Sequence, residues 1–250
     1  MTTPTLSLVT ICWNAAKTLQ QTLDAVLAQT VLPNGYLFVD GGSTDGTLEL
    51  LEKYRPRFEG QGCVFGVIPQ TRHPDEAGIP SAWNQAIPLV NGEIVALLNA
   101  DDWYEPETLE TILRAFTPEV DAVSCPVAMH AALPEDDWLF VPQSLAKLPW
   151  KMAVPHPGTF FRKRVYDRIG LYDTRYRISA DYDFVWRCHK ADIHWRYLQN
   201  RPLVHMRLGG LANSSRALAR RETYRIARNH CAWYDPRPLM AFLGRAITGR

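Results

Sequence analysis

The chain has 250 residues, of which 46% are hydrophobic, and this is enough for one large domain with a substantial core. The 21% charged fraction argues against disorder, and a net charge of +1 excludes binding to nucleic acid through bulk charge. Charge is uneven, however, because residues 201–250 hold ten Arg against two acidic residues, which is +8 and leaves −7 for residues 1–200. We therefore expect a basic C-terminal surface on a mildly acidic body.

The five cysteines are scattered and form no Cys-x-x-Cys pair, so neither a disulfide framework nor a zinc site is indicated. The first residues carry no basic segment, and the first apolar run breaks at Asn14, too early for a signal sequence. No apolar run approaches the roughly 20 residues of a membrane span. These features predict a cytoplasmic protein with reduced thiols, soluble or peripheral at the inner face of the plasma membrane.

Short apolar runs alternate with segments of helical spacing through the first half of the chain. The runs predict strands at 6–12, 36–39, 64–68, 94–98 and 121–127. The intervening segments predict helices at 19–28, about 48–54, 81–89 and 107–116. This order is typical of a mostly parallel α/β sheet with right-handed crossovers and helices on both faces.

The second half is less regular. Residues 131–155 contain several prolines and aromatic residues and are expected to be irregular or a β-excursion that forms part of an acceptor pocket. Beyond them, the pattern predicts strands at 158–161, 195–198 and 203–206, a helical turn at 164–169 and a helix from 181 to about 190. A glycine-containing loop at 209–215 leads into an Arg-rich helix. We therefore divide the chain into a domain at 1–212 and a basic helical segment at 213–250.

Two pairs of carboxylates follow predicted strands of the sheet. Asp101 and Asp102 come directly after a buried apolar run, and Asp40 and Asp45 follow the second strand. Because the carboxyl ends of parallel strands share one edge of a sheet, these acids should lie near one another. Adjacent acids repel each other unless a cation offsets them, so a divalent metal carrying a diphosphate is one explanation. The alternative is that they cap helices and turns.

A third acidic pair, Asp181 and Asp183, opens the later helix. If both are helical, they point to nearly opposite sides, so only one of them can face a site. The chain has no Gly-x-Gly-x-x-Gly and no phosphate-binding loop that ends in Lys-Ser/Thr. A bound nucleotide would therefore be held by carboxylates, backbone amides and a metal. The missing glycine-rich pyrophosphate loop also argues against a sugar-1-phosphate nucleotidyltransferase.

Six sequence motifs in order resemble glycosyltransferase family 2 over about residues 6–215. They are Thr10-Ile-Cys-Trp-Asn14, Asp40-Gly-Gly-Ser-Thr-Asp-Gly-Thr47, Asp75-Glu-Ala-Gly-Ile-Pro-Ser-Ala-Trp-Asn84, Leu98-Asn-Ala-Asp-Asp-Trp-Tyr-Glu-Pro106, Ala180-Asp-Tyr-Asp-Phe184 and Gly209-Gly-Leu-Ala-Asn-Ser214. The sequence is most similar to the enzymes that add single sugars in bacterial exopolysaccharide and O-antigen assembly, of the colanic-acid type. The resemblance implies the Rossmann-like GT-A fold and an inverting transfer from a nucleoside-diphosphate sugar, with UDP expected, assisted by Mn²⁺ or Mg²⁺.

The resemblance also implies roles for individual residues. Asp181 would be the catalytic base, with Asp183 as the alternative. The residues expected to bind the nucleotide are Thr10, Asn14, Asp40, Asn84 and Asp101, of which Asp40 would contact the base and Asp101 the ribose or the metal. Asp102 would be the direct metal ligand. These roles agree with the chemistry, because carboxylates suit a cation that neutralises a leaving diphosphate and a carboxylate can deprotonate an acceptor hydroxyl.

Two departures from the family pattern affect this interpretation. Asn99 replaces the first acid of the family's Asp-x-Asp, and Ala180 replaces the Glu that precedes the expected base. They motivate the alternative of a sugar-nucleotide-binding module that has lost turnover. The chain also lacks the Gln-x-x-Arg-Trp of processive synthases, so transfer of one sugar per encounter is expected.

Three further residues and the C-terminal segment have alternative interpretations. His205 would be a further metal ligand or a structural histidine, and His156 would contact the acceptor. Arg207, before the loop at 209–215, would close over the diphosphate. The Arg-rich segment would pack on the core or rest on anionic lipid, where a polyprenyl-diphosphate-linked glycan acceptor is expected.

Overall fold

The structure is a computed structural model that describes residues 3–71, 78–209 and 215–248. Its centre is a seven-stranded sheet with the order β10-β6-β9-β4-β1-β2-β3. The first four strands along the chain are β1 (Leu6–Cys12), β2 (Gly35–Asp40), β3 (Val64–Pro69) and β4 (Ile94–Leu97), and all four are parallel. All four were predicted from the sequence.

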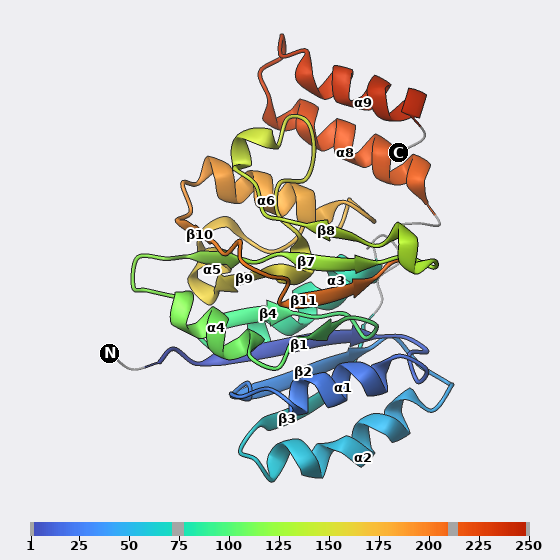
Figure 1. Ribbon diagram of the computed structural model, residues 1–250, viewed down its shortest axis with the longest axis vertical. Helices are drawn as coiled ribbons and strands as arrows, with labels where there is room; N and C mark the ends of the chain where they lie inside the picture. Colours follow the sequence, from blue (N-terminus) through green and yellow to red (C-terminus); the bar gives the residue numbers. More distant parts are fainter. Residues whose placement is uncertain (1–2, 72–77, 210–214, 249–250) are drawn as a thin grey trace.

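Helices cover both faces of this sheet, as expected (Figure 1). One face is covered by α1 (Leu19–Leu27), α2 (Thr47–Glu59) and α4 (Thr108–Ala115), and the other by α3 (Gly78–Ala86), α5 (Lys163–Ile169) and α6 (Ala180–Lys190). Strand β1 shows why two cores form: Leu6 and Leu8 join the first core, whereas Val9 joins the second. Side chains of a strand alternate between faces, so a strand buried on both sides is mostly apolar, and the buried Ser7 and Thr10 of β1 are hydrogen-bonded.

The sheet is not wholly parallel, because β9 (Thr159–Arg162) runs antiparallel to both β4 and β6 (Ala122–Ser124). The predicted strand at 121–127 is in fact two strands, since the chain leaves β6 at Cys125 and Pro126 and continues as β7 (Val127–His130). Pro lacks the N–H that would continue the ladder. The last strand of the large sheet is β10 (Trp195–Tyr197), parallel to β6.

A second, four-stranded sheet has the order β5-β11-β7-β8. It contains β5 (Trp103–Tyr104), which the sequence analysis did not predict, and β8 (Trp138–Phe140), from the stretch expected to be irregular or a β-excursion, of which β8 bears out the second. Strand β11 (Val204–Arg207) pairs with both β5 and β7, and its pairing with β5 brings His205 opposite Trp103. The small sheet therefore joins the loop after β4 to residues a hundred positions later.

The basic C-terminal segment forms two helices, α8 (Arg216–His230) and α9 (Arg237–Thr248), which lie together at one end of the molecule (Figure 1). Helix α8 packs on the domain rather than standing free, because Ile226 and Ala227 are fully buried in the second core. Trp233 lies beyond the end of α8 and is 83% exposed.

Candidate active site

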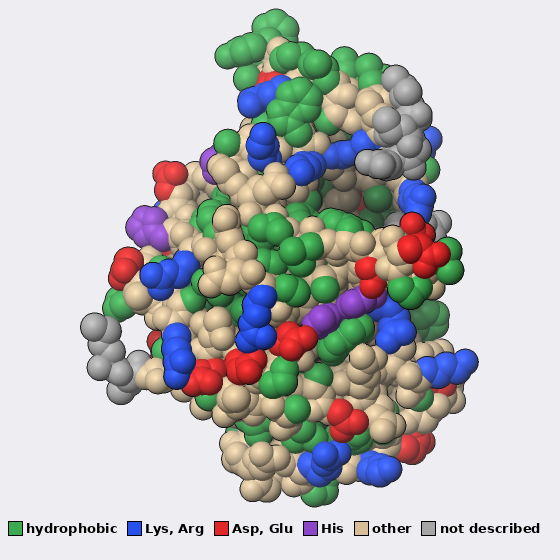
Figure 2. Space-filling model, viewed as in Figure 1, with side chains coloured by type: hydrophobic (Ala, Val, Ile, Leu, Met, Phe, Trp, Pro, Cys, Tyr) green, Lys and Arg blue, Asp and Glu red, His purple; other side chains and the backbone are tan. Residues whose placement is uncertain are grey.

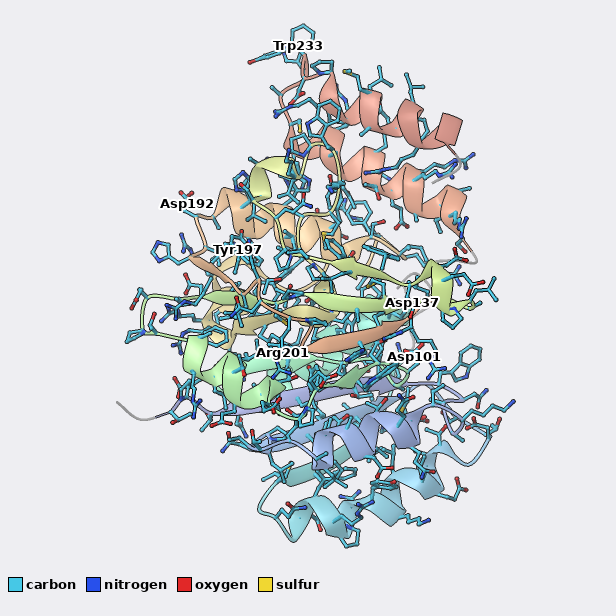
Figure 3. The ribbon with its side chains drawn as sticks, viewed as in Figure 1. Asp101, Asp137, Asp192, Tyr197, Arg201 and Trp233 are labelled. Carbon is cyan, nitrogen blue, oxygen red and sulfur yellow. The ribbon has the colours of Figure 1, made fainter. Side chains whose placement is uncertain are left out.

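A cavity of about 460 Å³ lies at the carboxyl ends of β1 and β4, and we call it the strand-end cavity. Residues from distant segments line it, including Asn14 after β1, Asp101 after β4 and Arg207 at the end of β11. Figure 3 shows Asp101 at this edge of the sheets. The cavity is where open α/β sheets bind ligands, and it brings together Asn14 and Asp101, two of the residues expected at the nucleotide.

The loop after β2 forms part of the same edge, but its acids bond to the backbone. Asp40 is buried, and one carboxylate oxygen accepts hydrogen bonds from the amides of Gly42 and Ser43 at 2.9 Å each. Asp45 accepts from the amides of Ala16 and Thr47 at 3.1 and 3.2 Å. Both acids therefore shape the loop, which is the turn-forming role that the sequence allowed as an alternative.

Asn14 connects this loop to the strand-end cavity. Its backbone has a φ of +51°, a left-handed conformation that Asn adopts more readily than most residues. Its side-chain oxygen accepts the amide of Thr44 at 2.8 Å, and its own amide donates to the Ser43 hydroxyl at 2.8 Å. Asn14 thus fixes the wall of the cavity that it was expected to line.

Asp101 and Asp102 are neighbours with different surroundings. Asp101 is partly exposed and lines the strand-end cavity, and burial raises its pKa. Asp102 is 1% exposed, and its two oxygens accept from the Arg207 amide and the Asn99 side chain, both at 3.1 Å. Burial, and then the charge of Asp101, raise its pKa well above the usual value. The accessible carboxylate is thus Asp101, and not Asp102 as expected.

His205 does not have a free ring nitrogen for a metal. One nitrogen bonds to His130 at 2.9 Å and the other to Glu105 at 2.6 Å, and the ring stacks on Trp103 with a centroid distance of 5.0 Å. Metal coordination needs an unprotonated ring nitrogen with no other partner. The structural interpretation of His205 is the one that its contacts favour.

A second cavity, of about 200 Å³, contains Asp181 and is called the Asp181 cavity here. Three residues, Ile79, Asn99 and Met206, line both cavities, so the two adjoin. His156 also lines the Asp181 cavity, as its predicted acceptor contact requires. Burial lowers the pKa of His156 to about 4, so the ring is neutral at physiological pH, and it stacks on Trp83 at 4.6 Å.

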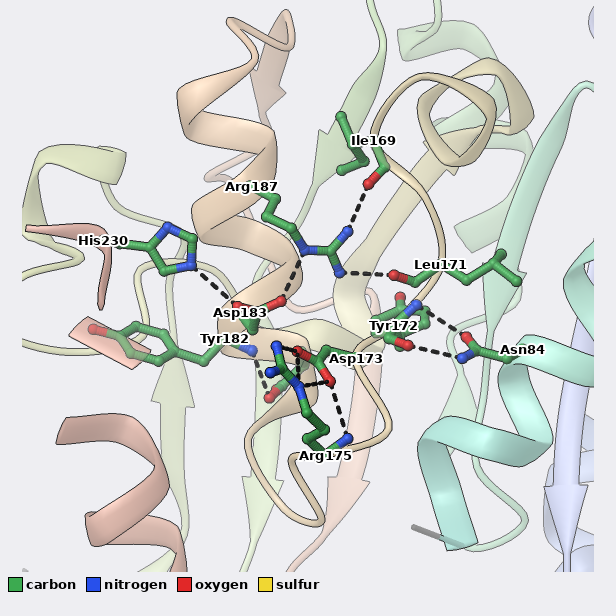
Figure 4. Close-up of polar contacts among 11 residues, drawn as sticks. Asn84, Ile169, Leu171, Tyr172, Asp173, Arg175, Tyr182, Asp183, Arg187 and His230 are labelled. Atoms are coloured by element: carbon green, nitrogen blue, oxygen red, sulfur yellow. Dashed lines mark hydrogen bonds and ion pairs between the residues drawn. The ribbon is translucent and has the colours of Figure 1, made fainter. Parts of the chain in front are cut away.

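The two acids of α6 occupy opposite environments, as their spacing predicted. Asp183 is buried and paired, accepting from Arg187 at 2.8 Å and bonding to His230 at 3.1 Å (Figure 4). Asp181 has the amide of Tyr182 as a partner at 2.8 Å and has no ion pair among the described residues. Burial raises its pKa to about 6. A carboxylate in a cavity with a raised pKa is suited to accept a proton.

Glu222 on α8 holds the segment that carries Asp181, and the sequence analysis did not identify it. Its carboxylate is buried and accepts the amides of Arg177, Ile178 and Ser179 at 2.8–2.9 Å, immediately before α6 begins. The one available signal was that Glu222 is the sole acid in the Arg-rich segment 216–230. Its partners are backbone amides, which no sequence pattern reveals.

Like Asp40, two further residues expected to bind the nucleotide do not line the strand-end cavity. Thr10 is 0% exposed, and its hydroxyl is bonded to the Tyr36 hydroxyl at 2.9 Å inside the first core. The side-chain amide of Asn84 donates to the Tyr172 carbonyl at 2.8 Å and accepts from the Tyr172 backbone amide at 2.9 Å (Figure 4). Thr10 belongs to the core side of β1, and Asn84 joins α3 to the chain before α6.

A mostly parallel sheet with carboxylates at its strand ends, next to a cavity that holds Asp181, fits the GT-A fold of sugar transferases. The family model of glycosyl transferase family 2 matches residues 7–170. The PGL/p-HBAD biosynthesis glycosyltransferase of Mycobacterium tuberculosis is 31% identical over 220 residues, which cover 86% of this chain and 81% of that protein. The chain therefore belongs to glycosyltransferase family 2 and is a transferase, as the motif series predicted.

Solved structures agree on the fold. The crystal structure of S. aureus TarS 1–349 in complex with UDP has a TM-score of 0.69 at 19% identity, and the match covers 98% of this chain and 72% of that one. The mannosyltransferase PcManGT from Pyrobaculum calidifontis, in complex with GDP-Man and Mn²⁺, has a TM-score of 0.68 at 18% identity, with coverages of 100% and 77%. In the match to a longer TarS chain, this protein covers 44% of the length of TarS.

Proposed function

We propose that this protein transfers a single sugar from a nucleoside-diphosphate sugar to an acceptor hydroxyl, with inversion, in cell-surface polysaccharide or glycolipid synthesis. The observation that carries the proposal is the adjoining pair of cavities: one holds Asp101 at the strand ends, the other holds Asp181, and Asn99 lines both. The donor would occupy the strand-end cavity and the acceptor the Asp181 cavity. UDP is the first donor nucleotide to test, supported by the UDP complex of the similar TarS fold.

Asp181 is the proposed base. It would take the proton of the acceptor hydroxyl as that oxygen attacks the anomeric carbon and the diphosphate leaves from the opposite face. Among the described residues lining its cavity, Asp181 is the one carboxylate. A second carboxylate that could form a covalent glycosyl intermediate is thus missing from that lining, which favours a single, inverting displacement.

Divalent metal would be held mainly by Asp101, with Asp102 behind it. Within the described ranges no three His, Cys, Asp or Glu side chains gather as a complete metal site. Two adjacent carboxylates nevertheless fit Mg²⁺ or Mn²⁺, because such ions commonly take one or two carboxylates and complete their shell with substrate phosphates. When bound, the ion would neutralise charge on the leaving diphosphate. Arg207 lies at the same cavity and would add a second positive charge.

The test is an assay of the purified protein with UDP-, GDP- and dTDP-sugars and Mn²⁺, with and without acceptors. We expect nucleotide release with one donor class, and a product of inverted anomeric configuration by NMR. Asp181→Asn should abolish release while isothermal titration still detects nucleotide binding. Tight binding without turnover on any donor and acceptor would instead favour a sugar-nucleotide-binding module, the alternative suggested by Asn99 and Ala180.

We also propose that the α8–α9 end rests on an anionic membrane surface, where a lipid-linked acceptor would be met. Trp233 and Tyr234, between the helices, are 83% and 74% exposed, and α9 exposes Leu239, Met240 and Leu243 on one side. Figures 2 and 3 show apolar side chains at this tip, with Trp233 at its end and Lys and Arg side chains beneath. None of the described helices combines the length and apolarity needed to cross a membrane.

Sedimentation with phosphatidylglycerol and phosphatidylcholine vesicles tests this surface. We expect binding to the anionic vesicles that weakens with salt, as charge attraction requires. The double substitution Trp233→Ser with Tyr234→Ser should weaken binding several-fold. Val64→Ser, at a 74% exposed position at the start of β3, is the matched control. Equal sedimentation with neutral vesicles, or none with either, would refute the proposal.

A further inference from the structure

The lining of the Asp181 cavity is unusually apolar for a site that receives a sugar hydroxyl. Of the fifteen described residues that line it, eleven are apolar, and the polar ones are Asn99, His156, Arg177 and Asp181. Two of these four are already engaged: Asn99 donates to Asp102, and His156 bonds to the Tyr172 hydroxyl at 2.9 Å. Asp181 and Arg177 are then the lining side chains left to pair with acceptor hydroxyls, fewer than a fully hydroxylated sugar ring requires.

Methionine is concentrated in this lining. The chain has five Met residues, and three of them, Met129, Met152 and Met206, line this one cavity. They come from β7, from the segment before β9 and from β11, so chain proximity does not explain their meeting. Thioether side chains are flexible and polarisable, and they make favourable contacts with aromatic rings and other apolar groups.

The size of the cavity limits what can enter. Its volume of about 200 Å³ is below the range of about 300–1,000 Å³ typical of pockets that enclose drug-sized ligands. It suits one ring beside the carboxylate of Asp181. The remainder of a longer acceptor would lie outside the cavity.

We infer that the acceptor presents its reacting hydroxyl on a ring with fewer hydroxyl groups than a hexose, either a deoxy sugar or an aryl ring, and that this ring occupies the Asp181 cavity. This inference rests on the proposed function, because it names the acceptor class of the same site. The apolar wall also accounts for the desolvation of Asp181. An apolar cavity lining would both select the acceptor ring and exclude water that would otherwise hydrolyse the donor.

The experiment compares matched acceptors that differ by one hydroxyl. One arm uses a methyl 6-deoxyhexopyranoside against the methyl hexopyranoside of the same configuration, and the other uses 4-methylphenol against 4-(hydroxymethyl)phenol. In at least one arm we expect kcat/KM to favour the apolar member by about 10- to 100-fold, the discrimination a hydrophobic pocket achieves against an added hydroxyl. The arm that responds identifies the ring as sugar or aryl.

Two variants place a polar atom in the wall: Met152→Gln, at a half-buried position, and Phe140→Tyr, which keeps the ring. Each should bring the ratio of kcat/KM for the two matched acceptors toward one, while nucleotide binding is unchanged. The second variant remains informative if the first fails to fold. Val64→Gln, far from the cavity at the start of β3, should keep the wild-type ratio.

Two outcomes would overturn the inference in distinguishable ways. Donor turnover with equal or better use of the hydroxylated acceptors would refute the apolar ring while leaving the proposed transferase function intact. Absence of any donor turnover, with or without acceptor, would remove both.

Discussion

The two sides of α6 give their carboxylates different hydrogen-bond partners and opposite pKa shifts. On one side, Asp183 is neutralised by Arg187 and His230, and these hydrogen bonds lower its pKa despite the opposing effect of burial. On the other, Asp181 faces a cavity with one backbone amide as its partner, and burial raises its pKa to about 6. The two residues have the same side chain and lie two positions apart on one helix.

Asp183 is a structural acid and Asp181 a candidate catalytic acid, and the two differ only in the environment of their carboxylates. Each oxygen of the buried Asp183 carboxylate already has a protein partner, and removing one member of such a buried pair is costly. A carboxylate left unpaired in a cavity lowers stability, and a protein tolerates this where the group reacts. Mutations on the two sides should therefore have opposite consequences.

The largest effect is expected from Asp181→Asn. Loss of a general base should lower kcat by about 10²–10⁴-fold, without loss of nucleotide binding. Because the folded-state pKa is raised above the usual value of about 3.9, ionisation destabilises the fold as pH rises from about 4 to 6. Asn cannot ionise, so thermal unfolding at pH 7.5 should show an unchanged or higher Tm. A large fall in Tm would show that Asp181 is structural.

Asp183→Asn should have the opposite signature. It leaves the half-buried Arg187 without its anion and removes the carboxylate partner of His230, which should lower the free energy of unfolding by about 3 kcal/mol. Urea denaturation at pH 7.5 measures this. Since the folded-state pKa of Asp183 is lowered, its contribution is present at neutral pH and is lost as the pH falls below about 4. The difference between variant and wild type should thus shrink in acid, and a constant difference would contradict the ion-pair explanation.

The pH dependence of transfer is the third test. The base must be ionised, so kcat should rise with pH through about 6 and level off above about 7. At pH 5 the ionised fraction, and with it kcat, should be about tenfold below the plateau. His156, with a pKa near 4, contributes no change over this range. A midpoint close to that of an unperturbed Asp would show that Asp181 is not desolvated during turnover.

The smallest expected effect is that of Glu222→Gln. Gln can accept fewer of the three amides before α6, so kcat should fall severalfold through misplacement of Asp181. The charge of Glu222 also helps to raise the pKa of Asp181, so its removal should move the acid limb of the pH profile to lower pH. A loss of stability with no shift in that limb would limit Glu222 to a role in folding.

The first half of the fold was accessible from the sequence because its strands are buried on both faces. Runs such as Leu6–Cys12 and Ile94–Leu97 are apolar at most or all positions, and this pattern is readable without any partner strand. The small sheet was not accessible: β5 has two residues and β8 has three, and β8 is largely exposed. These strands exist because β11 and β7 pair with them, which is a property of the folded chain.

The candidate site divides in the same way. Charge pattern and motif order located Asp101 and Asp181. The spacing of Asp181 and Asp183 placed them on opposite sides of α6, because the direction of a helical side chain follows from its position along the helix. Hydrogen-bond partners could not be read in this manner, so Thr10, Asn84 and His205 were expected at a ligand but are bonded to protein groups. Glu222 was missed for the same reason, since its partners are amides about 45 positions away.

The sequence by itself determined the family, the positions of the strands in the first half of the chain and the identity of the acids near the ligand edge. Only the tertiary structure decided which of those acids is open to a cavity, that α8 supports the segment before α6, and that three distant methionines meet beside Asp181. Local pattern fixes which face a side chain takes. Whether a side chain on that face is hydrogen-bonded, buried or open to a cavity depends on which other segments of the chain pack against it.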